Sequence, residues 1–208
     1  KRYPIDPQLN ALSYYWIGEA HYKMASYKEA IKWYRDFIKE PGGYNLSEHN
    51  DAYYNIAYSY FKQEDYASAI QSFRTFTQDQ NEIHKGKITD AFLRVGDGYY
   101  IQKDDDNAIM YYKKAIESGG GQIDYAKYQI GLSYGFKGNY REKGKIMLDI
   151  VNNHTASTFV VPALFEVGES YRLLDKNLDA EHSAKAKKYY EQLIRDYPRH
   201  PKVVDAIF

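Results

Sequence analysis

The chain has no cysteine. The side chains that could take part in catalysis or metal binding are therefore its histidines, one run of aspartates and a few pairs of carboxylates. The histidines are His21, His49, His84, His154, His182 and His200. None of them stands four residues from another, and no HExxH motif is present, so the helical zinc site is missing. Without cysteine there are no thiolate zinc ligands, thiol nucleophiles or disulfides. We therefore predict neither a metal nor a cofactor.

Three shorter motifs also have plain structural explanations. The run Asp104–Asp106 lacks the glycine and the distal glutamate of an EF-hand loop, so we expect a capped turn between two helices. Gly119–Gly121 is not followed by the Gly-Lys-Ser/Thr of a phosphate loop, and we expect a turn there too. Glu166 and Glu169 share one helical face, a common spacing for exposed acids. No residue pattern supports catalysis, and we predict that the protein is not an enzyme.

What the sequence does contain is a repeat. The segments "ALSYYWIGEAHYKMASYKEAIKWYRDF", "NDAYYNIAYSYFKQEDYASAIQSFRTF" and "TDAFLRVGDGYYIQKDDDNAIMYYKKA" align with one another and begin at Ala11, Asn50 and Thr89, 39 residues apart each time. A fourth copy begins at Asp124. A fifth begins at Val161 and contains an insertion around "DKNLDAEHSAKAK", which either lengthens a helix or forms an exposed loop. Self-similarity at such a period is the signature of a stacked repeat protein.

Small residues recur at fixed places within these copies. The first half of each copy has Gly18, Ala57, Gly96, Gly131 or Gly168, and the second half has Ala30, Ala69, Ala108 or Ala186. Two antiparallel helices approach closely only where one side chain is small. A glycine inside a helix costs about 1 kcal/mol relative to alanine, so its recurrence in register indicates a packing role.

With rings and aliphatic residues at the intervening positions, the copies resemble the tetratricopeptide repeat, a helix–turn–helix unit. The resemblance implies an all-α, right-handed superhelical solenoid of about five stacked antiparallel helix pairs, forming a single domain over residues 1–208. Repeats would start near 11, 50, 89, 124 and 161, with partial repeats at 1–10 and 199–208, as in an excerpt of a longer chain. Repeat four departs from the pattern, because Lys127 replaces a ring and Lys143 replaces the small residue. We expect it to be the weakest unit, unless Lys143 swings its charged end outward and packs only its stem while Gly144 makes the close contact.

The predicted helices span 7–23, 27–40, 47–63, 66–78, 88–102, 105–117, 122–137, 140–153, 158–174 and 183–196. Ser47 is the expected cap of the third helix.

The resemblance also implies a binding surface, since the concave face of such solenoids is lined by the first helix of each repeat. Tyrosine and tryptophan suit a binding surface because they combine a large apolar area with a polar tip. The alternative is that these rings pack on neighbouring helices. The residues carried over to this face are Tyr15, Trp16, Glu19, Tyr22, Tyr54, Asn55, Tyr58, Phe61, Arg94, Asp97, Tyr100, Tyr125, Tyr128, Gln129, Phe165, Glu166, Glu169 and Arg172.

We predict a scaffold that binds a protein or peptide partner there. The 28 basic and 28 acidic residues balance, which argues against a nucleic-acid partner. No apolar run is long enough to cross a membrane. Self-association through the end repeats stays open. The alternatives are a glycan-binding helical lipoprotein of nutrient capture and a helical accessory region of a larger enzyme.

The closing phrase "YYEQLIRDYPRHPKVVDAIF" is similar to the repeats of bacterial envelope proteins, the outer-membrane assembly lipoproteins and the Tol–Pal-associated proteins. That similarity implies a role in envelope assembly and a location in the bacterial periplasm or at the outer membrane. The alternative location is the cytoplasm.

Overall fold

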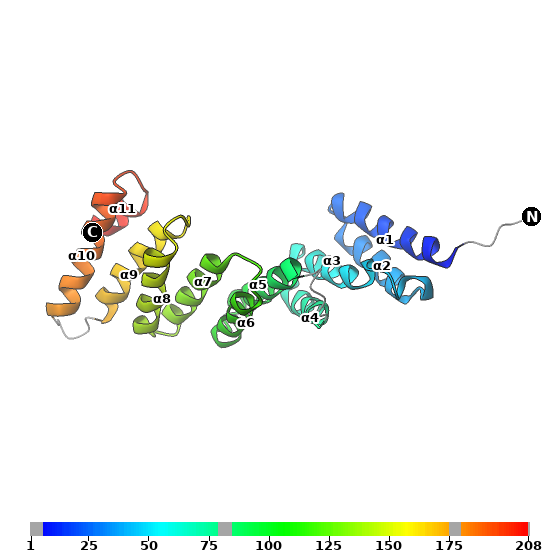
Figure 1. Cartoon of the computed structure of the whole chain (residues 1–208), viewed down its shortest axis with the longest axis horizontal. Helices are drawn as coiled ribbons and strands as arrows, with labels where there is room; N and C mark the ends of the chain where they lie inside the picture. Colours follow the sequence, from blue (N-terminus) through cyan, green and yellow to red (C-terminus); the bar gives the residue numbers. More distant parts are fainter. Residues whose placement is uncertain (1–5, 79–84, 175–179, 208) are drawn as a thin grey trace, which may run out of the picture. The chain divides into compact units, whose positions relative to one another are not determined.

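The fold is all-helical in the residues that the computed structural model describes, 6–78, 85–174 and 180–207 (Figure 1). That part of the chain contains eleven α-helices and one short 3-10 helix, Pro41–Gly43. The α-helices are α1 (Pro7–Lys23), α2 (Tyr27–Lys39), α3 (Glu48–Lys62), α4 (Tyr66–Phe76), α5 (Lys85–Ile101), α6 (Asp105–Ser118), α7 (Ile123–Phe136), α8 (Tyr140–Asn153), α9 (Val160–Leu174), α10 (Ala180–Asp196) and α11 (Lys202–Ile207).

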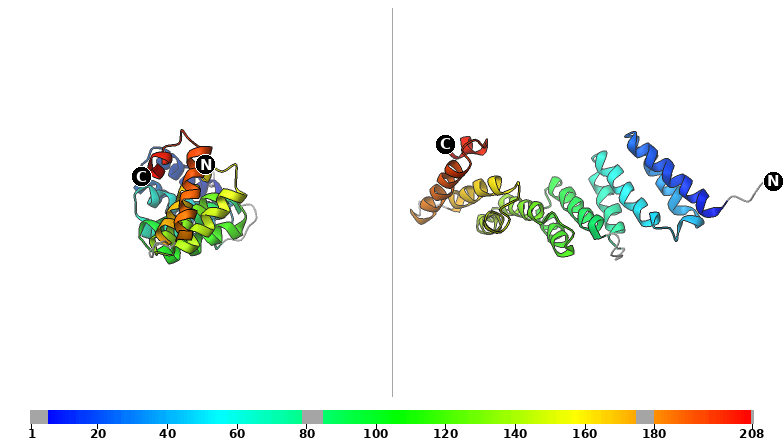
Figure 2. Two further views of the ribbon diagram at one scale, coloured as in Figure 1. Left: turned by 90° about the vertical axis from the view of Figure 1, so that its left-hand side faces the viewer. Right: turned by 45° about the horizontal axis from the view of Figure 1, so that its top comes forward.

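The chain divides into two compact units, residues 1–101 and 102–208, and the division falls inside repeat three. In unit 1, each helix from α1 to α4 packs against the next one in the sequence, and the same holds in unit 2 from α6 to α10 (Figures 1 and 2). This is the stacking in sequence order that the repeat predicts. A single domain over residues 1–208 stays a prediction.

The predicted helix boundaries agree with the structure to within about three residues. The main differences are that α5 and α10 each begin three residues early, at Lys85 and Ala180, so the insertion in repeat five lengthens the second helix from Ala180 on. The first part of this insertion, 175–179, lies outside the described residues, as do residues 79–84. Helix α11 occupies the place of the predicted sixth repeat.

The turn inside each pair follows one design in repeats one to four. The second residue before the start of the second helix has a positive φ angle, at Ala25, Glu64, Lys103 and Gly138. The next residue caps the helix in three cases, with Asp65, Asp104 and Asn139 accepting a backbone N–H. The run at Asp104 is therefore the capped turn expected from sequence. Ser47 is the residue before α3, as predicted, but its side chain does not cap the helix, because its own backbone is helical and its hydroxyl donates to Glu48.

The predicted small residues lie where two helices touch. A Cβ atom built on Gly18 would be 2.8 Å from two ring carbons of Tyr34, and one on Gly168 would be 2.5 Å from the ring of Tyr190. At Gly131 the same atom would meet the end of Met147. In these three pairs the first helix therefore provides a gap and the second helix fills it with a large side chain.

Repeat four keeps the close contact of Gly131 with Met147 but has a lysine at the small position of its second helix. Lys143, at the position where the other repeats have alanine, is 7% exposed, and its stem packs against Gly135. Gly144, the next residue, makes a close contact with the following repeat, since a Cβ atom there would lie 3.2 Å from Cβ of Ser170 on α9. Glu166 of α9 neutralises the Lys143 ammonium at 2.5 Å. The lysine thus keeps both its stem and its charge buried.

The second unusual lysine of repeat four is satisfied in a similar way. Lys127 of α7 pairs with Asp149 of α8, and its Nζ lies 2.9 Å from Nε2 of His154. Lys127 also lowers the pKa of Asp149 by donating to its carboxylate. Both departures from the repeat pattern therefore come with an acidic partner.

We predict that Gly18→Ala lowers the free energy of unfolding by about 1–3 kcal/mol, because the new methyl group meets a ring that cannot move away. Tyr34 is fully buried, and its hydroxyl donates to Glu19 at 2.7 Å. The matched control is Gly86→Ala, since nothing lies within 4 Å of a Cβ atom there. Urea unfolding that gives the two variants equal stability would contradict the packing role of Gly18.

We predict that Glu166→Gln lowers the free energy of unfolding by about 3 kcal/mol, because it leaves the Lys143 ammonium buried without its counter-charge. The double variant with Lys143→Ala should recover most of this loss, since it removes the stranded charge. Glu191→Gln, which breaks an exposed pair with Lys187, should change stability by less than about 1 kcal/mol. Additive losses in the Lys143 and Glu166 variants would show that the pair is not coupled.

Candidate functional site

On the first helix of unit 1, the structure separates two neighbouring rings. Tyr15 is 7% exposed and belongs to the core, whereas Trp16 is 59% exposed and lies edge-on to Tyr15, with ring centres 5.3 Å apart. Tyr22, six residues after Trp16, is half-buried against Tyr27. Of the three rings predicted here, Trp16 is the one that α1 presents to solvent.

Glu19 ties α1 to the next two helices. Its Oε1 accepts hydrogen bonds from the Tyr34 hydroxyl at 2.7 Å and from Nδ2 of Asn55 at 2.6 Å. Asn55 also donates to the Tyr15 hydroxyl at 3.2 Å. Asn55 was predicted to contact a partner, but its amide is already engaged within the protein.

Asp90 on α5 accepts hydrogen bonds from a second group of side chains. The Tyr54 hydroxyl donates to Oδ2 of Asp90 at 2.8 Å, and the Tyr58 hydroxyl donates to the same atom. Nε of Arg94 lies 3.4 Å from Oδ1 of Asp90, and its Nη1 donates to Asp97 at 2.5 Å. Burial, followed by the effect of Asp90, raises the pKa of both tyrosines, so they stay protonated donors.

These contacts set the charge of the surface. We use the name first-helix face of unit 1 for Trp16 together with Glu19, Asp90, Arg94 and Asp97. Three carboxylates face one guanidinium, and Arg94 is already paired with two of them. Because its charge is compensated, Arg94 is poorly suited to orient a partner's carboxylate.

The remaining predicted residues of unit 1 are less exposed than a free platform would be. Phe61 is half-buried and lies edge-on to Tyr66, and Tyr100 is also half-buried. Sequence reasoning did not identify the anchors Tyr34 and Asp90. The four-residue spacing of Asp90 and Arg94 on one helix was the one available signal for their pairing.

In unit 2, the predicted residues also make contacts within the protein. Tyr125 and Tyr128 pack on Phe159, with ring centres 5.8 and 5.0 Å apart. Gln129 is half-buried, and its Oε1 has no hydrogen-bond partner in the part of the chain that the structure describes. Phe165 lies against Tyr190 and beneath Nζ of Lys202, 4.6 Å from the ring centre.

Arg172 holds Glu169 with two hydrogen bonds, at 2.9 and 2.6 Å, and the Tyr190 hydroxyl donates to the same carboxylate. These donors lower the pKa of Glu169. The predicted acid pair therefore splits, with Glu166 bound to Lys143 and Glu169 bound to Arg172. Because the predicted site draws on both units, its assembly into one groove stays a prediction.

The described residues contain no cluster of three or more histidine, aspartate or glutamate side chains that could hold a metal ion. None of their helices combines the length and the apolar character needed to cross a membrane.

The fold resembles several solved structures at low sequence identity. The C-terminal part of a TPR repeat-containing protein from Cytophaga hutchinsonii superimposes with a TM-score of 0.73 and 17% identity, covering 94% of this chain and 71% of that one. RapI in its apo form gives 0.71 and 12%, covering 91% of this chain and 54% of RapI, so the chain spans about half of RapI. YrrB, described as a TPR protein with an unusual peptide-binding site, gives 0.68 and 18%, covering 94% and 91%.

At these identities the likeness concerns the fold, and it confirms the predicted solenoid of helix pairs. No curated protein matches the sequence. Sequence models described as tetratricopeptide repeat match residues 17–83 and 54–123, and another of the same description matches 162–200. These matches leave out residues 124–161, which are repeat four with its two unusual lysines. Since the first model alone covers residues 17–123, more than half of the chain, the protein belongs to the tetratricopeptide repeat family.

Proposed function

We propose that the chain is a non-enzymatic scaffold that binds a segment of a partner protein on the first-helix face of unit 1. The observation that carries this proposal is the exposed indole of Trp16, which is held edge-on to the buried ring of Tyr15. A rigid aromatic side chain that is supported from below and open above is typical of the residues that dominate binding energy. The peptide-binding site described for YrrB, a protein of the same fold, supports the proposal.

The charges of this face determine the chemistry of the partner. Asp97 is buried, so Glu19 and Asp90 against Arg94 leave one net negative charge at the surface, and a bound segment would gain from lysine or arginine side chains. An arginine or lysine stacked on the Trp16 indole would add a cation–π contact. The partner is therefore a basic segment and not a carboxylate-terminated one, which the sequence alone had left open.

The finer proposal is that this binding serves assembly in the bacterial envelope. It rests on the similarity of the closing phrase "YYEQLIRDYPRHPKVVDAIF" to repeats of envelope proteins. Fractionation of cells that produce the full-length protein tests the location. Recovery in the periplasmic or outer-membrane fraction supports the proposal, and recovery in the cytoplasm alone overturns it.

We predict that a photo-crosslinking amino acid at Trp16 captures a partner from a native extract, because this position is open and central to the face. The same residue at Lys32, which is exposed on the second helix α2, should capture far less. Sequencing of the captured segment should show lysine and arginine near the crosslink. Equal capture at both positions, or an acidic captured segment, would contradict the proposal.

A further inference from the structure

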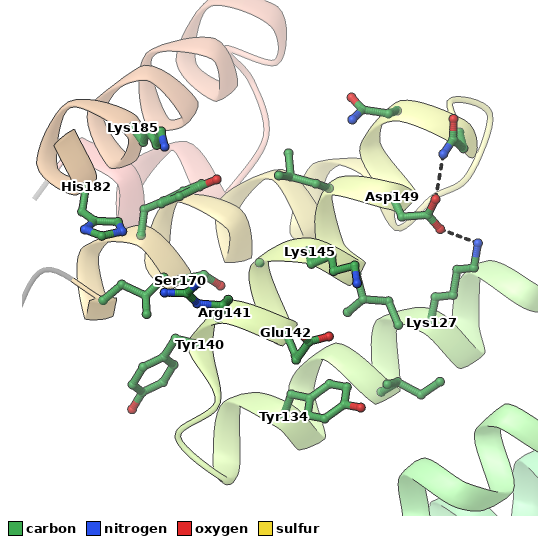
Figure 3. A pocket seen from close by; sticks show the side chains of 18 of the residues that line it. Lys127, Tyr134, Tyr140, Arg141, Glu142, Lys145, Asp149, Ser170, His182 and Lys185 are labelled. Atoms are coloured by element: carbon green, nitrogen blue, oxygen red, sulfur yellow. Dashed lines mark hydrogen bonds and ion pairs between the residues drawn. The ribbon is translucent and has the colours of Figure 1, made fainter.

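An open hollow of about 890 Å³ lies over α8 in unit 2 (Figure 3). It is lined by residues of α7, α8, α9 and α10, together with Lys113 of α6. Gly144 and Leu148 of α8 and Ser170, Tyr171 and Leu174 of α9 contribute its small and apolar surface. This hollow is outside every site that the repeat pattern predicts.

The sequence of repeat four explains why this surface is open. Gly144 stands where the first three repeats have isoleucine, and the residues at that position are Ile31, Ile70 and Ile109, all buried. In repeat two, the isoleucine fills the space against Gly98 of the next helix, where a Cβ atom would lie 3.0 Å from Ile70. In repeat four, the glycine is on α8 and the opposing residue is Ser170. This position of α8 therefore has no branched side chain, and α8 meets α9 there through Gly144 and Ser170, beside the hollow that both residues line.

The charges around the hollow are strongly one-sided although the whole chain is neutral. Two carboxylates, Glu142 and Asp149, line it. The cationic side chains are Lys113, Lys127, Arg141, Lys145 and Lys185. Five cations against two carboxylates leave three net positive charges around one concave surface, and such a surface concentrates anions.

Three of these cations have no ion-pair partner among the described residues. Lys127 pairs with Asp149, and Lys185 pairs with Glu181, but Lys113, Arg141 and Lys145 make no such contact there. Arg141 and Lys145 stand one helical turn apart on α8, where like charges repel each other. Figure 3 shows both of them at the hollow, with Lys185 and His182 of α10 across from them.

A comparable hollow in unit 1 shows the contrast. It measures about 490 Å³ and is lined by α2, α3 and α4. Its arginine, Arg35, donates to the Tyr60 hydroxyl at 2.7 Å and lies over the same ring, so it already has a partner. Repeat four has enlarged a surface of this kind and left its cations available.

We propose that the hollow over α8 is a second binding surface, which takes an acidic segment of a partner protein. Carboxylates of the segment pair with Arg141 and Lys145 on one side and with Lys185 on the other, displacing the exposed Glu181 from Lys185. Apolar side chains of the segment cover Leu148, Tyr171 and Leu174. The mixture of charged and apolar lining favours a peptide, whose acidic and aliphatic side chains match both parts, over a nucleic acid held chiefly through its phosphates.

The test is selection of random peptides displayed on phage against the intact chain, followed by anisotropy measurements with the selected peptides. We expect selected peptides that combine aspartate or glutamate with leucine or an aromatic residue. Their binding should weaken about tenfold in the double variant Arg141→Glu/Lys145→Glu and less in Arg141→Gln/Lys145→Gln. It should also weaken with rising salt. The matched control is Lys28→Glu/Lys32→Glu, the same change on two exposed lysines one turn apart on α2, which should leave binding unchanged.

All the substituted side chains are exposed, so melting temperatures equal to wild type will show that the variants are folded. The following outcomes would overturn the proposal. Selected peptides without acidic residues, or peptides that bind all variants equally, would exclude this surface. Single-stranded nucleic acid or anionic vesicles that bind through Arg141 and Lys145, where the acidic peptides do not, would assign the hollow to another class of ligand.

Discussion

The whole structure depends on how closely the two helices of a pair can approach. In repeats one and five, a glycine of the first helix faces a tyrosine of the second, and a single added carbon at Gly18 or Gly168 would overlap the ring. Because the contact is close, the ring lies against the first helix, fully buried at Tyr34 and half-buried at Tyr190, and its hydroxyl emerges beside that helix. There it reaches Glu19 in repeat one and Glu169 in repeat five. The packing constraint thus also places the polar groups of the binding surface.

Repeat four shows what happens when this constraint is met in a different way. The Ala-Ile pair of the first three repeats is replaced by Lys143 and Gly144. The lysine takes the space of the alanine and is neutralised by Glu166, while the glycine brings α8 close to α9. A buried ion pair of this kind contributes little net stability compared with apolar packing, so stability does not account for the exchange. The exchange lies beside the positively charged surface over α8, which Gly144 lines.

The helices, their order and the contact positions could be predicted from the sequence, because a repeat that occurs five times shows which positions the packing needs. The roles of individual polar residues could not. Tyr34 and Glu19 are 15 residues apart, and Tyr54 and Asp90 are 36 apart, so their pairing depends on how one helix lies on another. Asn55 and Arg94 were correctly placed on the first helices, but the internal partners that occupy them were invisible in the repeat pattern. The hollow over α8 was missed because Gly144 was considered only as a contact residue, whereas its effect comes from the side chain it lacks.

The most direct test of this account is an exchange of two residues that leaves the composition unchanged. Lys143→Gly/Gly144→Lys moves the lysine to the position that contacts Ser170 and takes its ammonium away from Glu166. The same exchange at Lys85 and Gly86, both exposed at the start of α5, is the matched control. Thermal unfolding followed by circular dichroism should show a large loss of stability for the exchange in α8 and almost none for the exchange in α5. Equal melting temperatures for the two variants would contradict the claim that the close helix contact decides the structure of repeat four.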